Sequence, residues 1–308
     1  MPDTDGGPHP TAAVLLAAGE GKRMRSALPK VMHPIGGVTL LGHAAAAVAT
    51  LQPEHLAVVV GHGREQVSSD VEALGKQLAR PLVTAVQEQQ LGTGHAVQCG
   101  LEALPGGLAG AVVVTYADVP LLDAATLRGL LAEHAAAGAA VTLLTAEFAD
   151  PAGYGRVVRG PGGAVTGIVE HGDATPEQRV IREINSGVYA FDAAFLTAGL
   201  AELSGHNAQG ELYLTDLVAA AVARGLPVRS VGCPDLWQVQ GVNDRVQLAQ
   251  VRAELNRRVL QRWMLAGVTV VDPTTTWVDV GVRLGRDVVL YPGTQLYGST
   301  VVDDGAQV

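Results

Sequence analysis

The chain of 308 residues contains two cysteines, 4% aromatic residues and fewer basic than acidic side chains, and each scarcity excludes a class of protein. Cys99 and Cys233 have no metal-ligand spacing and cannot supply a disulfide framework, so a reducing cytoplasm is the simplest setting. With 21 Lys and Arg against 30 Asp and Glu, the net charge of −9 argues against nucleic-acid binding. No apolar run reaches membrane-spanning length, so we expect no membrane partner.

The N-terminal residues and the histidines also lack a functional pattern. Residues 1–11 have neither a basic segment nor a long apolar one, so we expect a disordered tail rather than a signal peptide. The nine histidines never have the spacing of metal ligands. His62, His95 and His171 each stand next to a glycine, where we expect turns and structural roles.

Glycine, alanine and aliphatic residues are abundant instead. The 38 glycines and many alanines suit close packing of helices on a sheet, and 48% hydrophobic residues permit a sizeable core. Strand and helix patterns alternate through the first half of the chain, which is typical of a parallel sheet with helices on both faces. We expect strands at 12–18, 56–60, 82–86, 111–116 and 140–146. We expect helices at 38–51, 64–78, 93–103 and 124–137, the last ending at Gly138.

A glycine-rich loop follows the first expected strand. It reads LAAGEGKRM at 16–24 and is followed by Pro29-Lys30. Its two glycines allow a sharp turn with N–H groups that face a ligand. Lys22, Arg23 and Lys30 place positive charge there in an otherwise acidic chain, so we expect a phosphate site.

Two common phosphate loops are absent from this stretch. A dinucleotide fingerprint needs a glycine where Met24 stands. A P-loop needs a glycine where Leu16 stands and Ser or Thr where Arg23 stands. The alternative to a phosphate site is an ordinary strand-to-helix turn with solvated basic residues.

Polar residues follow other expected strands. Gln87, with Gly92 and Thr93 before the next helix, could present an amide and N–H groups to a flat polar ring such as uracil, although a helix-capping turn would look similar. Asp118 follows a buried strand, where a carboxylate suits Mg²⁺, while Asp123 is the better helix cap. Asn243 could be a cap of the next helix.

The middle of the chain is less regular. Short β-rich segments carry Gly155, Glu170 and Asn185, and we expect a lid that binds a hydroxylated ligand, although each segment alone could be a hairpin surface. An apolar helix at 216–223 and a strand at 236–240 follow.

The spacing of the apolar residues changes in the C-terminal region. A helix at 244–265 is expected to form an arm between domains, with an apolar face made of Val246, Leu248, Val251, Leu255, Val259 and Met264. After Gly267, an aliphatic residue recurs at every sixth position, which indicates a parallel β-helix. These residues are Leu284, Leu290, Leu296, Val302 and Val308.

In this order, the motifs closely resemble the bacterial family of bifunctional N-acetylglucosamine-1-phosphate uridyltransferases and glucosamine-1-phosphate acetyltransferases. The resemblance runs from about Ala12 to the end of the sequence. It implies an α/β fold with a doubly wound, Rossmann-like nucleotidyltransferase domain at 12–245, a linker helix at 246–266 and the start of a left-handed parallel β-helix at 267–308.

The resemblance also implies roles for individual residues. UTP would be bound by Leu16, Ala17, Ala18, Gly19 and Lys30, and its uracil by Gln87, Gly92 and Thr93. Residues along the nucleotide would be Tyr116, Ala117 and Asp118, and the Mg²⁺ ligands would be Asp118 and Asn243. The N-acetylglucosamine moiety would contact Gly155, Glu170 and Asn185, and the catalytic cations facing the phosphates would be Arg23 and Lys30. Two departures from the family are Ala117, where a glycine is common, and Lys22, where a smaller polar residue is frequent.

The implied reaction is Mg²⁺-dependent uridylyl transfer from UTP to N-acetylglucosamine 1-phosphate, which gives UDP-N-acetylglucosamine and pyrophosphate for cell-wall precursors. Full-length members form homotrimers through the β-helix. The hexapeptide series here covers little more than one coil, so we expect a truncated chain that trimerises weakly or not at all and lacks the acetyltransferase activity.

Two other hypotheses remain. The chain could be a nucleotidyltransferase for another sugar phosphate, which a panel of nucleotides would distinguish. It could also be a non-catalytic regulatory or scaffold protein. Such proteins usually lose the lysine or a metal ligand, whereas Lys30, Asp118 and Asn243 are all present.

Overall fold

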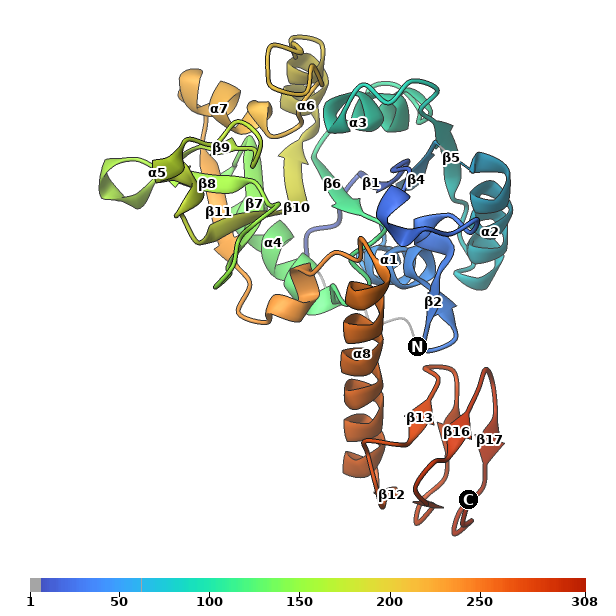
Figure 1. The fold of residues 1–308 in the computed structure, drawn as a ribbon. Coiled ribbons are helices and arrows are strands. Elements are labelled where there is room, and N and C mark those ends of the chain that lie inside the picture. The colour runs from blue at the N-terminus through green and yellow to red at the C-terminus, as the bar shows by residue number, and fades with distance from the viewer. Residues whose placement is uncertain (1–6, 62) are drawn as a thin grey trace.

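The computed structural model describes residues 7–61 and 63–308 of the chain. A sheet covered by helices forms the larger part, and the long helix α8 (Arg245–Leu265) leads from it to a small C-terminal group of short strands (Figure 1). Residues 1–6 of the expected tail, and His62, lie outside the described residues. None of the described helices combines the length and apolarity that a membrane span requires.

The main sheet is mixed rather than parallel. In spatial order its main strands are β11 (Val228–Gly232), β7 (Val141–Glu147), β10 (Glu183–Asp192), β6 (Ala111–Tyr116), β1 (Ala12–Ala17), β4 (His55–Val60) and β5 (Val83–Val86). β10 lies between β6 and β7 and is antiparallel to both, while the other pairs on this path are parallel. The five strands expected in the first half, β1, β4, β5, β6 and β7, run in the same direction, so the expected parallel arrangement is confirmed for them. The reversed β10 was not expected, because a strand buried on both faces reads as a continuous apolar run in either direction.

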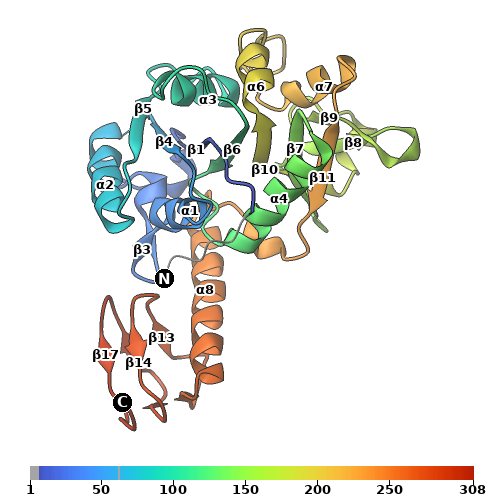
Figure 2. The same cartoon turned by 180° about the vertical axis from the view of Figure 1, so that it is seen from behind.

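Helices cover both faces of this sheet (Figure 2). One face carries α1 (Leu40–Ala49), α2 (Arg64–Gln77) and α4 (Ala124–Ala137). The other carries α3 (Thr93–Glu102), α6 (Ala193–Leu200) and α7 (Asp216–Ala223). The strands and helices expected in the first half are confirmed to within a few residues, including the Asp123 cap and the left-handed Gly138 that ends α4. His95 lies within α3 and not in a turn, whereas His171 does lie in a turn.

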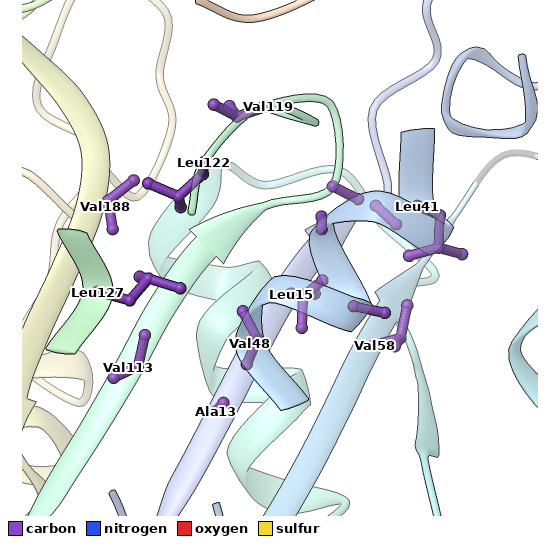
Figure 3. Packing of buried hydrophobic residues seen from close by; sticks show 14 of the residues in the cluster. Ala13, Leu15, Leu41, Val48, Val58, Val113, Val119, Leu122, Leu127 and Val188 are labelled. Carbon is purple, nitrogen blue, oxygen red and sulfur yellow. The ribbon is translucent and has the colours of Figure 1, made fainter. Parts of the chain in front are cut away.

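Alternate residues of β1 enter the two cores. Ala13 and Leu15 pack with Leu41, Val48 and other side chains on the α1 face (Figure 3). Val14 and Leu16 pack on the α3 face. Because both faces of the strand are buried, all six β1 residues are apolar, and the polar residues of this segment are confined to the loop that follows.

The expected lid is partly correct. β8 (Arg156–Arg159) and β9 (Val165–Val169) form an antiparallel hairpin beside β10, and the four-residue α5 (Pro176–Arg179) follows. The segment with Asn185, in contrast, belongs to the central ten-residue strand β10. The pairing of β10 with β7 shifts its register between Asn185 and Tyr189. Because of this irregularity, the sequence pattern indicates a short segment where the structure has one long strand.

The segment expected as a strand at 236–240 is the 3₁₀ helix η4 (Leu236–Val239). The Asp235 side chain accepts a local hydrogen bond from Trp237 N, and Gln238 Nε2 donates to the distant Asp123, so side-chain hydrogen bonds replace a strand ladder. Helix α8 is confirmed, but Val246 and Met264 are exposed. The buried Leu248, Val251 and Val259 follow a three- and four-residue spacing along one face of the helix, and Val246 and Met264 do not belong to this spacing.

The C-terminal strands pair only in parallel. The three pairs are β12 (Thr269–Val270) with β15 (Val289–Leu290), β13 (Trp277–Val278) with β16 (Gln295–Leu296), and β14 (Arg283–Leu284) with β17 (Val301–Val302). The small hairpin of β2 (Pro34–Ile35) and β3 (Val38–Thr39) contacts this group, because Gly36 O accepts a hydrogen bond of 3.0 Å from Val280 N. Arg252 of α8 also bonds to Pro34 O, so the hairpin links the two parts of the chain.

Candidate active site

The glycine loop lies at the carboxyl end of β1. Gly21 has a φ of +63°, and a Cβ atom there would lie 2.7 Å from Lys30 Cβ. Glycine at this position therefore serves both the turn and the close approach of Lys30, which begins the short helix η2 (Lys30–Met32). In the preceding helix η1 (Lys22–Met24), Met24 is the buried residue, packed in a cluster with Ile35 and Val242.

Lys30 joins two loops at the centre of the site. Its ammonium group donates hydrogen bonds to Asp118 Oδ2 and, at 3.3 Å, to Asn243 Oδ1. The Lys30 and Asp118 side chains are only 13% and 16% exposed, so neither is an ordinary surface charge. Val242 N donates to Asp118 O at 2.9 Å and holds the two loops together.

Asn243 is not the cap of α8. Asp244 is, since its Oδ1 accepts a hydrogen bond of 2.8 Å from Gln247 N. The Asn243 backbone N–H is satisfied by Gln247 Oε1 at 2.7 Å. The capping alternative for Asn243 is therefore wrong, and its amide is free to face Lys30 and Asp118.

The Asp118 carboxylate and the Asn243 amide oxygen fit Mg²⁺. Both oxygens converge on one cation, the Lys30 ammonium. The described residues contain no cluster of three or more His, Cys, Asp or Glu side chains that could hold a metal without a substrate. Mg²⁺ is commonly held by one or two protein oxygens together with water and substrate phosphate, and this pair of donors matches that pattern.

The segment at 87–94 forms one wall of the site. Gln87 is 5% exposed, and its Nε2 donates to Gly92 O at 3.0 Å. Thr93 Oγ1 accepts from Leu214 N at 3.0 Å, and Gly94 N donates to Leu212 O at 2.7 Å. The loop is thus fixed by a segment far along the chain.

The opposite end of the site brings Gly155, Glu170 and Asn185 together. Asn185 N donates to Gly155 O at 2.9 Å, and a Cβ on Gly155 would lie 3.2 Å from Glu170 Oε2. Glu170 Oε1 accepts from Thr215 Oγ1 at 3.0 Å. Burial raises the pKa of Glu170 above its ordinary value, against the lowering effect of the Thr215 hydrogen bond.

These groups surround a single cavity of about 420 Å³. The expected site residues that line it are Leu16, Ala17, Ala18, Gly19, Lys30, Gln87, Gly92, Thr93, Tyr116, Asp118, Gly155, Glu170, Asn185 and Asn243. Sequence segments more than 200 residues apart therefore meet at one site, as ligand sites do at the carboxyl ends of strands in such sheets.

Two expected residues lie outside the cavity lining. Ala117 is fully buried in the core, so its methyl group points away from the cavity, and its backbone N–H donates to Leu16 O at 3.0 Å. Arg23 is exposed, because the turn of η1 that buries Met24 directs Arg23 outward. A role for Arg23 toward the phosphates stays a prediction.

Several lining residues were not predicted. Gln90 donates from Nε2 to Ala18 O at 2.8 Å and ties the 87–94 segment to the glycine loop. Tyr154, whose pKa is raised by burial, and Glu211 line the end of the cavity near Glu170. Gly187 and Gly241 also line the cavity, beside Tyr116 and Asn243 respectively. Each lies within a few residues of a predicted site residue or in a polar motif, which was the available signal.

The chain is similar to known proteins over nearly its whole length. Bifunctional protein GlmU of Rhodococcus opacus (strain B4) is 56% identical over 304 residues, which cover 98% of this chain and 61% of the relative. The GlmU of Thermobifida fusca (strain YX) is 56% identical over 303 residues, with 97% and 62% covered. The chain thus spans about 61% of the length of these relatives.

Solved structures share the fold at low identity. A UDP-glucose pyrophosphorylase complexed with UDP-glucose matches with a TM-score of 0.65 and 18% identity, covering 81% of this chain and 99% of the other. A putative glucose-1-phosphate thymidylyltransferase from Bacillus anthracis matches with a TM-score of 0.64 and 18% identity, covering 79% and 94%. These similarities establish the nucleotidyltransferase-like α/β fold.

A protein-family model matches more than half of the chain. The MobA-like NTP transferase domain matches residues 13–208, which contain the glycine loop, Lys30, the 87–94 segment, Asp118 and the three residues around the far end of the cavity. The chain therefore belongs to the family of MobA-like NTP transferase domains, a nucleotidyltransferase family.

Proposed function

We propose that the chain transfers the uridylyl group of UTP to N-acetylglucosamine 1-phosphate, forming UDP-N-acetylglucosamine and pyrophosphate. The observation that carries the proposal is the meeting of Lys30, Asp118 and Asn243 between a glycine loop and a polar pocket. The high identity to proteins named GlmU over nearly the whole chain supports the choice of substrates.

The reaction requires two anions to meet. A phosphate oxygen of the sugar phosphate attacks the α-phosphorus of UTP, a new P–O bond forms, and the bond to the β-phosphate oxygen breaks to release pyrophosphate. Negative charge builds on the leaving group, and we assign its stabilisation to the Lys30 ammonium, whose side chain is only 13% exposed. No covalent bond to the protein is needed.

Asp118 and Asn243 would hold Mg²⁺, which when bound neutralises charge on the triphosphate and the departing pyrophosphate. Gln87, Gly92 and Thr93 would bind the uracil. Glu170, Asn185 and Gly155 would bind the N-acetylglucosamine moiety, since a partly buried carboxylate and amide suit a hydroxylated ring.

The remaining parts of the chain have proposed roles as well. We assign 12–245 to the uridyltransferase domain, 246–266 to a linker and 267–308 to the start of a left-handed β-helix, which the three parallel strand pairs support. The reaction would supply a cell-wall precursor, and a cytoplasmic location stays a prediction from the sequence.

The test is product formation from UTP and N-acetylglucosamine 1-phosphate. We expect UDP-N-acetylglucosamine and pyrophosphate in equal amounts with Mg²⁺, and almost none after chelation. A panel of UTP, dTTP, CTP, ATP and GTP with glucose 1-phosphate and glucosamine 1-phosphate separates this reaction from transfer to another sugar phosphate. Absence of product from every pair would favour a non-catalytic role.

A further inference from the structure

The side-chain amide of Gln87 has both of its N–H groups occupied. Nε2 lies 3.0 Å from Gly92 O and 3.1 Å from His95 Nδ1. An amide nitrogen has two protons, so these two contacts use its full donating capacity. The backbone of Gln87 is also fixed, because its N–H donates to Val60 O at 2.8 Å and continues the pairing of β5 with β4.

The chemistry of the partners determines which way the amide faces. Gly92 O is a carbonyl oxygen and can only accept, so the amide nitrogen must face it. His95 Nδ1 then has to accept the second N–H, which requires a neutral imidazole protonated on Nε2. That nitrogen lies 3.6 Å from Cys99 Sγ, one turn further along α3, and a thiol sulfur can accept the proton weakly.

The remaining polar atom of this amide is Oε1. Within the described part of the chain, no hydrogen-bond donor reaches it. Gln87 lines the cavity, so a ligand there meets an amide that can accept and cannot donate. His95 does not itself line the cavity.

We propose that His95 is a positioning residue for nucleotide selection: it locks Gln87 with Oε1 as the acceptor for a ring N–H of the base, such as N3–H of uracil. The inference rests on the proposed function and explains how its site would choose a base. Cytosine presents an unprotonated N3 at the corresponding atom, so two acceptors would face each other. A polar group left unpaired in a buried site discriminates more strongly than a missing apolar contact.

Without the His95 acceptor, the lock on Gln87 is incomplete. Gly92 O alone would then hold the amide nitrogen, so a flip that turns the N–H groups toward the ligand would break one hydrogen bond instead of two. The flipped amide could donate to N3 of cytosine, whereas the unflipped amide accepts from N3–H of uracil. Loss of His95 should therefore weaken discrimination more than it weakens binding in general.

The test compares His95→Leu, which removes the acceptor, with His95→Asn, whose Oδ1 can accept near the position of Nδ1. Gln98→Ala on the same helix is the matched control, because Gln98 bonds to Glu102 in an exposed pair. For each variant we would measure kcat/KM for UTP and CTP, and the binding of both nucleotides by calorimetry without sugar phosphate. We expect H95L to lose at least tenfold of the UTP-to-CTP preference through the nucleotide KM, with an unchanged sugar-phosphate KM. H95N and Q98A should keep the preference.

The proposal is overturned if folded H95L keeps the wild-type preference, or if H95N loses as much as H95L, since packing and not an acceptor would then matter. A measurement on the unaltered protein covers the case in which H95L does not fold. N3-methyl-UTP lacks the ring proton, and we expect it to bind at least tenfold more weakly than UTP; equal binding would reject the acceptor role of Gln87. Failure of the proposed function is a different result, namely no UDP-N-acetylglucosamine from the wild-type protein, and the binding measurements remain decisive in that case.

Discussion

Lys30 Nζ lies 3.3 Å from Asn243 Oδ1 although 213 residues separate them in the sequence, and the same ammonium group donates to Asp118. One cation therefore holds together the two oxygen donors that we assign to Mg²⁺. The ion pair with Lys30 offsets the free-energy cost of removing the poorly exposed Asp118 carboxylate from water. It also keeps a lysine at the position where the triphosphate charge is expected.

Lys30→Ala should lower kcat at least 100-fold, because it removes the poorly exposed cation that we assign to the leaving group. This loss corresponds to about 2.7 kcal/mol of transition-state stabilisation. Turnover at saturating UTP, sugar phosphate and Mg²⁺ gives the measurement. Lys22→Ala is the matched control, since Lys22 is 83% exposed and pairs with Glu20 at the surface. Equal activity of the two variants would argue against a catalytic role for Lys30.

Asp118→Asn and Asn243→Ala should each remove most activity through weaker Mg²⁺ binding while the fold is kept. The readout is the Mg²⁺ concentration that gives half of the maximal rate, together with the Mg²⁺-dependent gain in Tm when UTP is present. Asp303→Asn is a suitable control, because Asp303 is exposed and outside the cavity. Near-normal turnover of either variant at saturating Mg²⁺ would reject this pair as the metal ligands.

Glu170→Gln should stabilise the protein increasingly as the pH rises. Burial raises the pKa of Glu170, so folding favours its protonated form. Below its ordinary pKa the group is neutral in both the folded and the unfolded state, and the substitution should change little. As the pH rises through the raised folded value, the wild-type protein alone carries the cost of a buried charge. The Tm difference between variant and wild type should therefore grow from pH 4 to pH 8.

Glu183→Gln is the matched comparison and should show the opposite slope. The hydrogen bonds from Arg159 lower the pKa of Glu183, so its contribution to stability is present above its ordinary pKa and is lost as the pH falls through the folded value. This variant should be destabilised at pH 7 and little changed at low pH. Parallel slopes for the two variants would contradict the assigned environments.

Glu170→Gln should also alter sugar choice, since the carboxylate lies at the end of the cavity with Asn185. Wild-type protein should use glucosamine 1-phosphate poorly as an acceptor of the uridylyl group. We expect the ratio of kcat/KM for the two sugar phosphates to fall in the variant. Equal use of both sugars by the wild-type protein would show that this pocket is wrongly assigned.

Gly187→Ala should impair both stability and activity. Gly187 has a φ of +80°, and a Cβ there would lie 2.0 Å from Tyr116 Cε2, so the cavity-lining tyrosine would have to move. Gly162→Ala isolates the backbone contribution, because Gly162 has a φ of +81° and no atom within 4 Å of the added Cβ. Both variants should lose about 1 kcal/mol through left-handed strain. Only G187A should lose a further 1 to 3 kcal/mol, roughly, through overpacking, and only G187A should lose activity. Chemical denaturation and turnover test both expectations.

The sequence by itself determined the alternation of strands and helices and the identity of most cavity residues. Local interactions carry this information: the apolar run of β1 reflects burial on both faces, and Asp123 and Gly138 mark the ends of α4 through local hydrogen bonds and a left-handed turn. The glycine loop was recognisable from its two glycines and the basic residues around it, and the left-handed φ of Gly21 explains why a glycine stands there.

Only the tertiary structure decided the direction of strand β10 and the hydrogen-bond partners of individual site residues. The antiparallel entry of β10 between β6 and β7 depends on long-range pairing, which a continuous apolar pattern does not encode. The sequence allows Asn243 to cap α8, whereas in the structure Asp244 occupies the cap position. Arg23 and Ala117 stand in a site motif, yet the burial of Met24 and the packing of the core direct both away from the cavity. Likewise, the hydrogen bond from Gln87 to His95 exists because α3 begins close to the end of β5, and side-chain geometry of that kind follows from packing rather than from spacing.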